Sequence, residues 1–157
     1  VKDLQARWQK DALDLKPDVI SILIGVNDIG AVVYNQDPET IEQFEERYTR
    51  ILDSTKAALP DTLIVLCEPF ILPLGRVNEK TETWQAEVRK QQAVVRKLAD
   101  TYQAVFVELQ EPFRNACKKA PQRYWIWDGI HPMPAGHELI ARAWIKELRK
   151  KLTFIKG

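Results

Sequence analysis

Cysteine, histidine and serine are scarce in this sequence, which limits the kinds of site that it can form. The 157 residues contain two cysteines and two histidines, and the only serines are Ser21 and Ser54. Cys67 and Cys117 are far apart and lack Cys-x-x-Cys spacing, so we expect free thiols and no metal site. Free thiols fit a reducing compartment, and we therefore expect a cytoplasmic protein.

Long hydrophobic runs and an excess of charge of one sign are also absent. No apolar stretch approaches the roughly 20 residues that a membrane-spanning helix needs, so we expect no stable membrane insertion. The net charge is +1, and lysines and arginines are interspersed with acidic residues, which argues against a nucleic-acid partner. With 45% hydrophobic residues, the sequence predicts a single globular domain over residues 1–157.

Short apolar strands alternate with amphipathic helices along the chain. Apolar and β-branched runs predict strands at residues 19–24, 62–67 and 105–107. Apolar side chains at three- and four-residue spacings predict helices at residues 1–15, 38–59, 83–102 and 110–119 and at the C-terminus. We expect Asp37-Pro38 to start the second helix, with the carboxylate as its cap. The alternation predicts an α/β three-layer sandwich with a parallel sheet and right-handed crossovers.

The segment Trp127-Asp128-Gly129-Ile130-His131-Pro132 places a carboxylate three residues before an imidazole, in a loop too rich in glycine and proline to be helical. A carboxylate that accepts a hydrogen bond from one ring nitrogen fixes the tautomer and leaves the other nitrogen free to take a proton from a nucleophile. Asp128 and His131 are therefore candidates for the acid and the base of a hydrolytic triad. Taken alone, His131 could equally be an ordinary turn residue.

A second motif, Gly25-Val26-Asn27-Asp28, directly follows the first predicted strand. Ligands of α/β folds bind at the carboxyl ends of such strands. Gly25 allows a sharp turn, and Asn27 then offers a neutral amide donor to a developing oxyanion. The alternative is that Asn27 and Asp28 only cap a loop.

Together, the two motifs resemble those of the SGNH (GDSL-type) esterase/lipase family. The resemblance begins with Pro17-Asp18 leading into an apolar strand and continues with Gly25-Val26-Asn27-Asp28. It ends with Asp128-Gly129-Ile130-His131-Pro132 and with Ala135-Gly136-His137 at the start of the last helix. The resemblance therefore covers nearly the whole chain.

This resemblance implies both a fold and an activity. It implies a flavodoxin-like fold and a serine ester hydrolase of the acyl esterase, lipase or carbohydrate deacetylase type. Asn27 would belong to the oxyanion hole, with Asp128 and His131 as acid and base of a Ser-His-Asp triad. No cofactor is implied, and the partner would be a small-molecule acyl ester. An acetylated sugar, a lysophospholipid, a thioester and a short acyl ester all fit.

The nucleophile of this family is missing from the sequence. The family carries its serine in a Gly-Asp-Ser block on the first strand and a second oxyanion donor on a glycine of another block, and neither block is present. Ser21 falls inside a strand and Ser54 inside a helix, so we assign both to structure. We expect an upstream segment before Val1 to supply the serine, and the chain to be N-terminally incomplete and inactive by itself.

The missing strand would also affect the sheet. In the family's fold the first strand lies between the second and the third, so without it the strand ending at Ile24 has a free edge. Apolar edges seldom stay bare. We expect this edge to be covered by the upstream segment or by a neighbouring copy, which makes self-association through the edge possible.

Three residues are candidates for binding the substrate. They are Gly25 at the turn, Phe70 in an apolar, proline-rich loop after the second predicted strand, and Trp127 next to Asp128. The loop with Phe70 is expected to face the same crevice as Asn27. Packing in the core explains Phe70 and Trp127 equally well, so both interpretations stay open.

Two rival functions are compatible with the sequence. One is a catalytically inactive fragment or a non-catalytic α/β binding domain that keeps these loops for their shape. The other is a metal-dependent hydrolase that uses Asp28, Asp128 and His131, although the dense cluster of ligands typical of such sites is not apparent. Esterase activity that chelators do not inhibit would separate the three functions.

Overall fold

A three-stranded parallel sheet forms the centre of the molecule. The computed structural model describes residues 1–152. The strands β1 (Val19–Ile22), β2 (Leu63–Cys67) and β3 (Val105–Val107) are hydrogen-bonded in the order β1-β2-β3. Ile20 pairs with Ile64, and Leu66 pairs with Phe106. The three predicted parallel strands are confirmed, although β1 ends two residues before the expected end.

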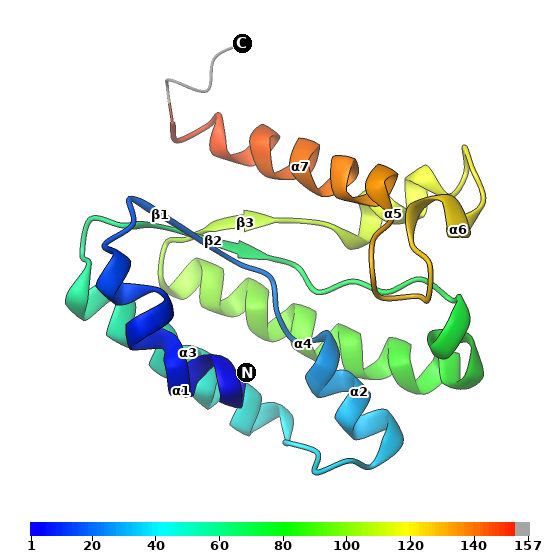
Figure 1. Ribbon diagram of the computed structural model, residues 1–157, viewed down its shortest axis with the longest axis horizontal. Coiled ribbons are helices and arrows are strands. Elements are labelled where there is room, and N and C mark those ends of the chain that lie inside the picture. The colour runs from blue at the N-terminus through cyan, green and yellow to red at the C-terminus, as the bar shows by residue number, and fades with distance from the viewer. Residues whose placement is uncertain (153–157) are drawn as a thin grey trace.

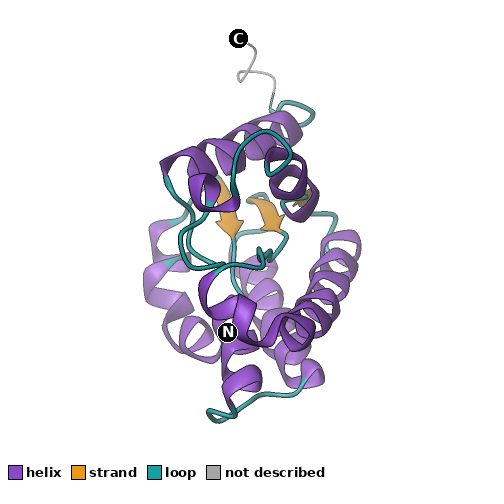
Figure 2. Ribbon diagram, turned by 90° about the vertical axis from the view of Figure 1, so that its right-hand side faces the viewer, coloured by secondary structure: helices purple, strands orange, loops and turns teal. Residues whose placement is uncertain are grey.

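Helices cover both faces of the sheet (Figure 1). One face is covered by α1 (Lys2–Asp11), α3 (Ile41–Ala58) and α4 (Thr81–Thr101), and the other by α5 (Gln110–Ala116) and α7 (Pro134–Leu148). Shorter elements connect them: η1 (Leu13–Leu15), α2 (Val26–Tyr34), η2 (Gly75–Lys80) and α6 (Gln122–Trp125). Figure 2 shows the sheet enclosed between helices, so the predicted three-layer α/β fold is confirmed. Within residues 1–152, no helix is both long and apolar enough to cross a membrane.

Two buried clusters hold the layers together, because successive strand residues point to opposite faces of the sheet. Ile20, Ile22, Ile64 and Leu66 pack with the side chains of the first helical layer, among them the fully buried Tyr48. The other strand side chains pack with the second helical layer, which includes Phe113 of α5 and Leu148 of α7. These strand residues are Val65, Cys67, Val105 and Val107. Alternate side chains of the strands thus contribute to both halves of the core.

Two local expectations about helices are wrong. The long helix α3 begins at Ile41 and its cap is Thr40, whose hydroxyl accepts a hydrogen bond from the main-chain N–H of Gln43 while the Gln43 side chain accepts one from Thr40. This capping box fixes the helix start, whereas Asp37 has a left-handed backbone conformation. The segment with Asn27, expected as a loop, is the first turn of α2.

The outer edge of β1 is free. β1 pairs with β2 alone, and in the part of the chain that the structure describes no strand pairs with its other side. Beyond the strand, Leu23 is exposed and Ile24 is half-buried. The expected free edge is therefore present in the described chain, and apolar side chains follow it at Leu23 and Ile24.

Candidate functional site

The loop from Ile126 to Pro132 closes on itself and holds Asp128 against His131. An antiparallel bridge joins Ile126 to Pro132, and the main-chain N–H of Trp127 donates to the carbonyl of His131 at 3.1 Å. Inside this loop, Asp128 Oδ1 accepts hydrogen bonds from the main-chain N–H groups of Ile130 (3.1 Å) and His131 (2.9 Å). Asp128 Oδ2 lies 2.8 Å from Nδ1 of the His131 ring. The structure therefore brings the two predicted residues into direct contact.

The environment of Asp128 favours its ionised form. The residue is only 8% exposed. Burial raises the pKa of its carboxyl, but hydrogen bonds from the main-chain and ring N–H groups of His131 and from the Ile130 N–H lower this pKa below its ordinary value. An ionised carboxylate can only accept, so Nδ1 of His131 is the donor, and in the neutral form of the ring Nε2 is the basic nitrogen. This is the tautomer that a general base requires.

Two further side chains flank the acid–base pair. The Trp127 ring stacks on the His131 ring, with centroids 5.9 Å apart and planes inclined by 24°. Trp127 is 62% exposed, so most of the indole faces solvent next to the imidazole. Arg76 lies with Nε 3.9 Å from Asp128 Oδ2. Nothing in the sequence motifs indicated Arg76; the one available signal was its position in the proline- and glycine-rich segment after a strand.

Two glycines allow the main chain of the acid–base loop to approach the segment that follows β2. A Cβ atom on Gly129 would lie 2.4 Å from the carbonyl oxygen of Leu74, and Gly129 has a φ of +98°. A Cβ atom on Gly75 would lie 2.7 Å from the carbonyl oxygen of Asp128. Side chains at these two positions would separate the loops, so the location of Asp128 depends on this contact.

Asn27 lies at the carboxyl end of β1, as expected, but on a helix. It is exposed in the first turn of α2. Gly25 precedes this helix with a φ of +119°, and a Cβ atom there would lie 2.2 Å from Oε1 of the buried Gln91. The predicted sharp turn at Gly25 is present. Asp28 Oδ1 accepts a hydrogen bond from the main-chain nitrogen of Val1 at 2.7 Å.

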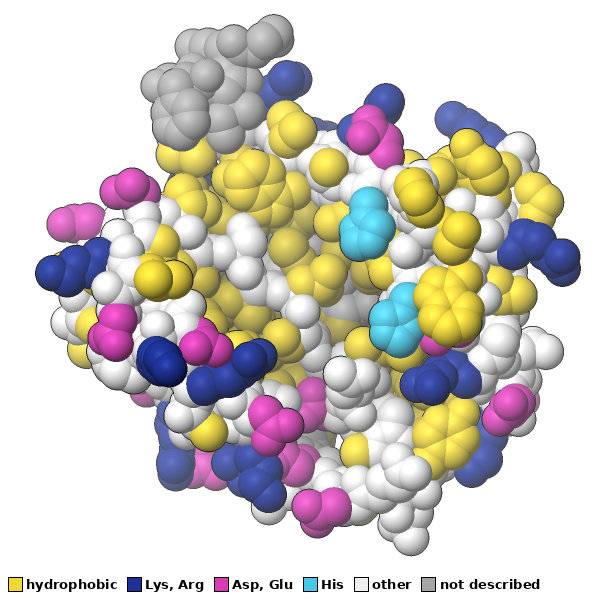
Figure 3. Space-filling view, in the orientation of Figure 1, with side chains coloured by type: hydrophobic (Ala, Val, Ile, Leu, Met, Phe, Trp, Pro, Cys, Tyr) yellow, Lys and Arg dark blue, Asp and Glu magenta, His cyan; other side chains and the backbone are white. Residues whose placement is uncertain are grey.

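The two motifs contribute to the walls of one hollow of about 170 Å³. Leu23, Ile24 and Val26 line it from the segment leading to Asn27, and Ile130 and Pro132 line it from both sides of His131. A second hollow, of about 560 Å³, lies beyond the end of β1, between α1 and the start of α2, and shares three of these residues; its lining also includes Gly25, Asn27 and Asp28. Figure 3 shows hydrophobic side chains lining a depression on this face, with both histidines beside it.

Phe70 lies in the core and also lines the smaller hollow. Phe70 and Pro69 complete the wall of the smaller hollow. Phe70 is also buried, and its ring stacks on Phe113 with centroids 4.2 Å apart. It therefore supports the wall of the hollow from the core side.

The two serines have other partners, as their positions in the sequence indicated. Ser21 Oγ accepts a hydrogen bond from Trp144 Nε1 at 2.7 Å, across the sheet surface. Ser54 Oγ donates to the carbonyl of Ile51 at 2.9 Å within its own helix. Within residues 1–152, no three histidine, cysteine, aspartate or glutamate side chains are grouped as metal ligands would be.

Comparisons with known proteins identify several relatives. The sequence model of the GDSL-like Lipase/Acylhydrolase family matches residues 1–139. An acetylxylan esterase from Geobacillus stearothermophilus is 29% identical over 152 residues, which is 94% of this chain and 67% of that protein. A solved structure from Parabacteroides merdae, described as a GDSL-like lipase, is 39% identical with a TM-score of 0.89 and covers 96% of this chain and 68% of its own.

Structures of the Geobacillus enzyme are also similar to this one. An acetyl-xylooligosaccharide esterase mutant is 28% identical with a TM-score of 0.79, covering 94% of this chain and 66% of that one. Other structures of the enzyme carry alanine in place of a catalytic aspartate, a catalytic serine and a catalytic histidine. In that enzyme the histidine follows the aspartate by three positions. The present chain spans about two thirds of the length of these relatives.

The contact between the two loops leads to a prediction about stability. Gly129→Ala is expected to lower the free energy of unfolding by about 1–3 kcal/mol, because alanine would be strained at this φ and would overlap the Leu74 carbonyl. Gly30→Ala is the matched control: its Cβ would meet Trp84 at an ordinary 3.5 Å inside α2, so this change should be neutral or stabilise by up to about 1 kcal/mol. Urea unfolding of both variants measures the difference. Equal stability of the two would contradict the tight contact between the loops.

Proposed function

This chain belongs to the GDSL-like Lipase/Acylhydrolase family, and we propose that it hydrolyses carboxylic esters with a Ser-His-Asp triad. His131 is the base, Asp128 is the acid, and the serine comes from a segment upstream of Val1. The single observation that carries the proposal is the 2.8 Å contact between His131 Nδ1 and Asp128 Oδ2 beside an apolar hollow.

The Geobacillus enzyme supports these assignments. Its catalytic aspartate and histidine have the same three-residue spacing as Asp128 and His131. Its catalytic serine lies further ahead of its aspartate than this chain has residues before Asp128. A serine from a preceding segment is consistent with that order, and the two serines of this chain already have structural partners.

The proposed reaction has two steps. The serine oxygen attacks the ester carbonyl while Nε2 of His131 takes its proton, and the Asn27 amide donates to the oxyanion. The imidazolium, stabilised by ionised Asp128, then protonates the leaving alcohol as the C–O bond breaks, which leaves an acyl-serine. In the second step His131 removes a proton from water, water attacks the acyl group, and the proton returns to the serine as the acid leaves. Gly25 contributes the turn that sets Asn27 at the end of β1.

We propose a short acyl ester of a sugar as the substrate. The smaller hollow, about 170 Å³ and lined by apolar side chains, suits a short acyl group. The exposed Trp127 ring next to His131 offers a flat apolar surface on which a sugar ring can stack. The relationship to an acetylxylan esterase supports the same choice.

The free edge of β1 fits the proposed upstream segment. A strand carrying the serine could pair there, and the residues that follow it could reach the hollow of about 560 Å³ beyond the end of β1, which Asn27 helps to line. Such pairing would provide hydrogen-bond partners for the main-chain N–H and C=O groups on the outer edge of β1. A second copy of the chain is the alternative occupant of this edge.

The activity test uses the chain with its native upstream segment and p-nitrophenyl acetate as substrate. Asp128→Asn should lower kcat by about 10⁴, because the wrong tautomer of His131 is then favoured. Asn27→Ala should lower kcat by about 10²–10³ through loss of one oxyanion donor. Asp100→Ala, at an exposed position near the C-terminal end of α4, is the control and should behave as wild type.

Each result of this test distinguishes between the candidate functions. Full activity of Asn27→Ala would remove Asn27 from the site. If no activity appears even with the upstream segment, the chain is better explained as a non-catalytic binding domain. If chelators abolish the activity, the metal-dependent alternative is favoured over the triad.

The sugar substrate is tested by replacing Trp127. Trp127→Ala should lower kcat/KM for an acetylated xylo-oligosaccharide about fivefold more than for p-nitrophenyl acetate, since stacking is worth about 1 kcal/mol and only the sugar ester would use it. Tyr124→Ala is a matched control, because Tyr124 is also an exposed aromatic residue, 57% exposed, but packs edge-on against Trp125. An equal loss on both substrates would show that Trp127 acts on His131 rather than on sugar.

A further inference from the structure

We propose that Gln110 is a positioning residue for the Asp128–His131 pair, and that it acts through the segment of residues 68–74, called here the β2 loop. Gln110 lies at the start of α5 and does not belong to any motif of the sequence. A role of Gln110 in catalysis rests on the proposed function. The structural link itself can be tested without any enzymatic activity.

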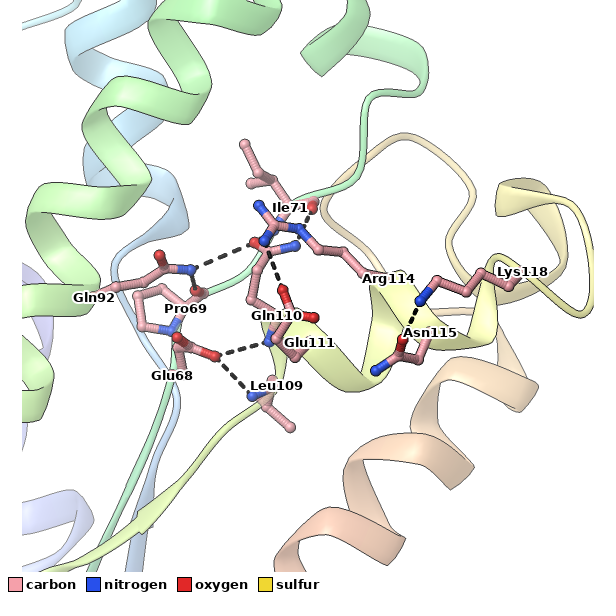
Figure 4. Close-up of polar contacts among 10 residues, drawn as sticks. All are labelled: Glu68, Pro69, Ile71, Gln92, Leu109, Gln110, Glu111, Arg114, Asn115 and Lys118. Atoms are coloured by element: carbon pink, nitrogen blue, oxygen red, sulfur yellow. Dashed lines mark hydrogen bonds and ion pairs between the residues drawn. The ribbon is translucent and has the colours of Figure 1, made fainter.

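The β2 loop needs side-chain partners for its main chain. Its residues Pro69, Phe70, Ile71 and Leu72 are buried but belong to no helix or strand. Buried main-chain N–H and C=O groups outside regular structure must be paired in another way. Gln110 pairs with both groups of one residue: the Ile71 N–H donates to Gln110 Oε1 at 3.2 Å, and Gln110 Nε2 donates to the Ile71 carbonyl at 2.9 Å (Figure 4).

Gln110 is itself fixed in place. Its main-chain N–H and that of Leu109 donate to Glu68 Oε2 at 2.8 and 2.9 Å. Gln92 Nε2 lies 3.4 Å from Gln110 Oε1 and donates to the carbonyl of Pro69 at 2.9 Å. Figure 4 shows these side chains converging on the β2 loop from α4 and α5. Gln110 is 8% exposed, so water has little access to replace its amide.

The β2 loop in turn holds the acid–base loop. The Leu72 N–H, next to Ile71, donates to the carbonyl of Gly129 at 2.9 Å. Gly129 is the residue directly after Asp128, and it fits against Leu72 and Leu74 without space for a side chain. The connection therefore runs from the Gln110 amide through the main chain of Ile71 and Leu72 to the main chain beside Asp128.

Through this connection Gln110 can affect the position of Asp128 and His131, although Gln110 itself does not contact the substrate. Without the amide, both main-chain groups of Ile71 would be buried and unpaired, so the β2 loop would shift to find other partners. A shift of the Leu72 N–H would move Gly129 and thus the Asp128–His131 contact. Misplacement of catalytic groups by about 1 Å can cost on the order of 100-fold in rate.

The test compares two variants that each remove a buried, hydrogen-bonded polar group. Gln110→Met keeps the approximate size of Gln110 but cannot bond Ile71. Thr55→Val is the matched control: the Thr55 hydroxyl accepts from Trp8 Nε1 at 2.9 Å and donates to Ile51 at 2.7 Å, in the helical layer on the other face of the sheet. The measurement is the NMR signal and solvent-exchange rate of the His131 Nδ1 proton, at a pH where the imidazole is neutral.

In Gln110→Met this proton should exchange at least about tenfold faster than in wild type or should lose its signal, while Thr55→Val keeps the wild-type rate. A wild-type rate in Gln110→Met, or an equal increase in both variants, would overturn the proposal. The result does not depend on ester hydrolysis, so it can fail or succeed separately from the proposed function.

Gln110→Glu decides the question if Gln110→Met does not fold. A protonated carboxyl can donate to the Ile71 carbonyl and accept from its N–H, whereas an ionised one can only accept and repels that carbonyl. The Nδ1 proton of Gln110→Glu should therefore approach wild-type protection as the pH falls and become less protected than wild type as the pH rises. Wild-type protection of this variant at every pH would also overturn the proposal.

Discussion

The carboxylate of Asp128 is the group on which the site depends. It accepts two main-chain N–H groups on one oxygen and the His131 ring on the other, so a single buried side chain sets the shape of its loop and the tautomer of the base. These hydrogen bonds outweigh burial and keep the pKa of Asp128 low. The negative charge thus remains available to stabilise an imidazolium that forms when His131 takes a proton.

The rest of the molecule positions this loop. Parallel strands bring the end of β1 and the β2 loop to one edge of the sheet, as in other α/β proteins. Close packing at Gly75 and Gly129 then joins the β2 loop to the loop with Asp128. The smaller hollow lies between these segments and the residues leading to Asn27, so one cavity connects groups that are about a hundred positions apart in the sequence.

The sequence alone predicted the helices and strands that have regular apolar spacing. It also predicted contacts between residues that are close together in the sequence. The three strands and the long helices followed from apolar spacing, and the contact of Asp128 with His131 followed from a three-residue separation within one loop. The helix at Asn27 was missed because Gly25 and the polar pair after it are also typical of a loop. Thr40 rather than Asp37 caps α3, since the capping box with Gln43 outweighs a single carboxylate. Contacts such as those of Gln110 with Ile71 and of Arg76 with Asp128 join distant segments, and no local pattern encodes them.

The central claim is that Asp128 and His131 complete a triad whose serine comes from outside this chain. The most direct measurement is a crystal structure of the chain with its native upstream segment after reaction with a serine-directed phosphonate ester. The account predicts a phosphonylated upstream serine, with His131 Nε2 and the Asn27 amide each within about 3 Å of an oxygen on phosphorus. An adduct that lies away from both residues, or a protein that forms none, would contradict it.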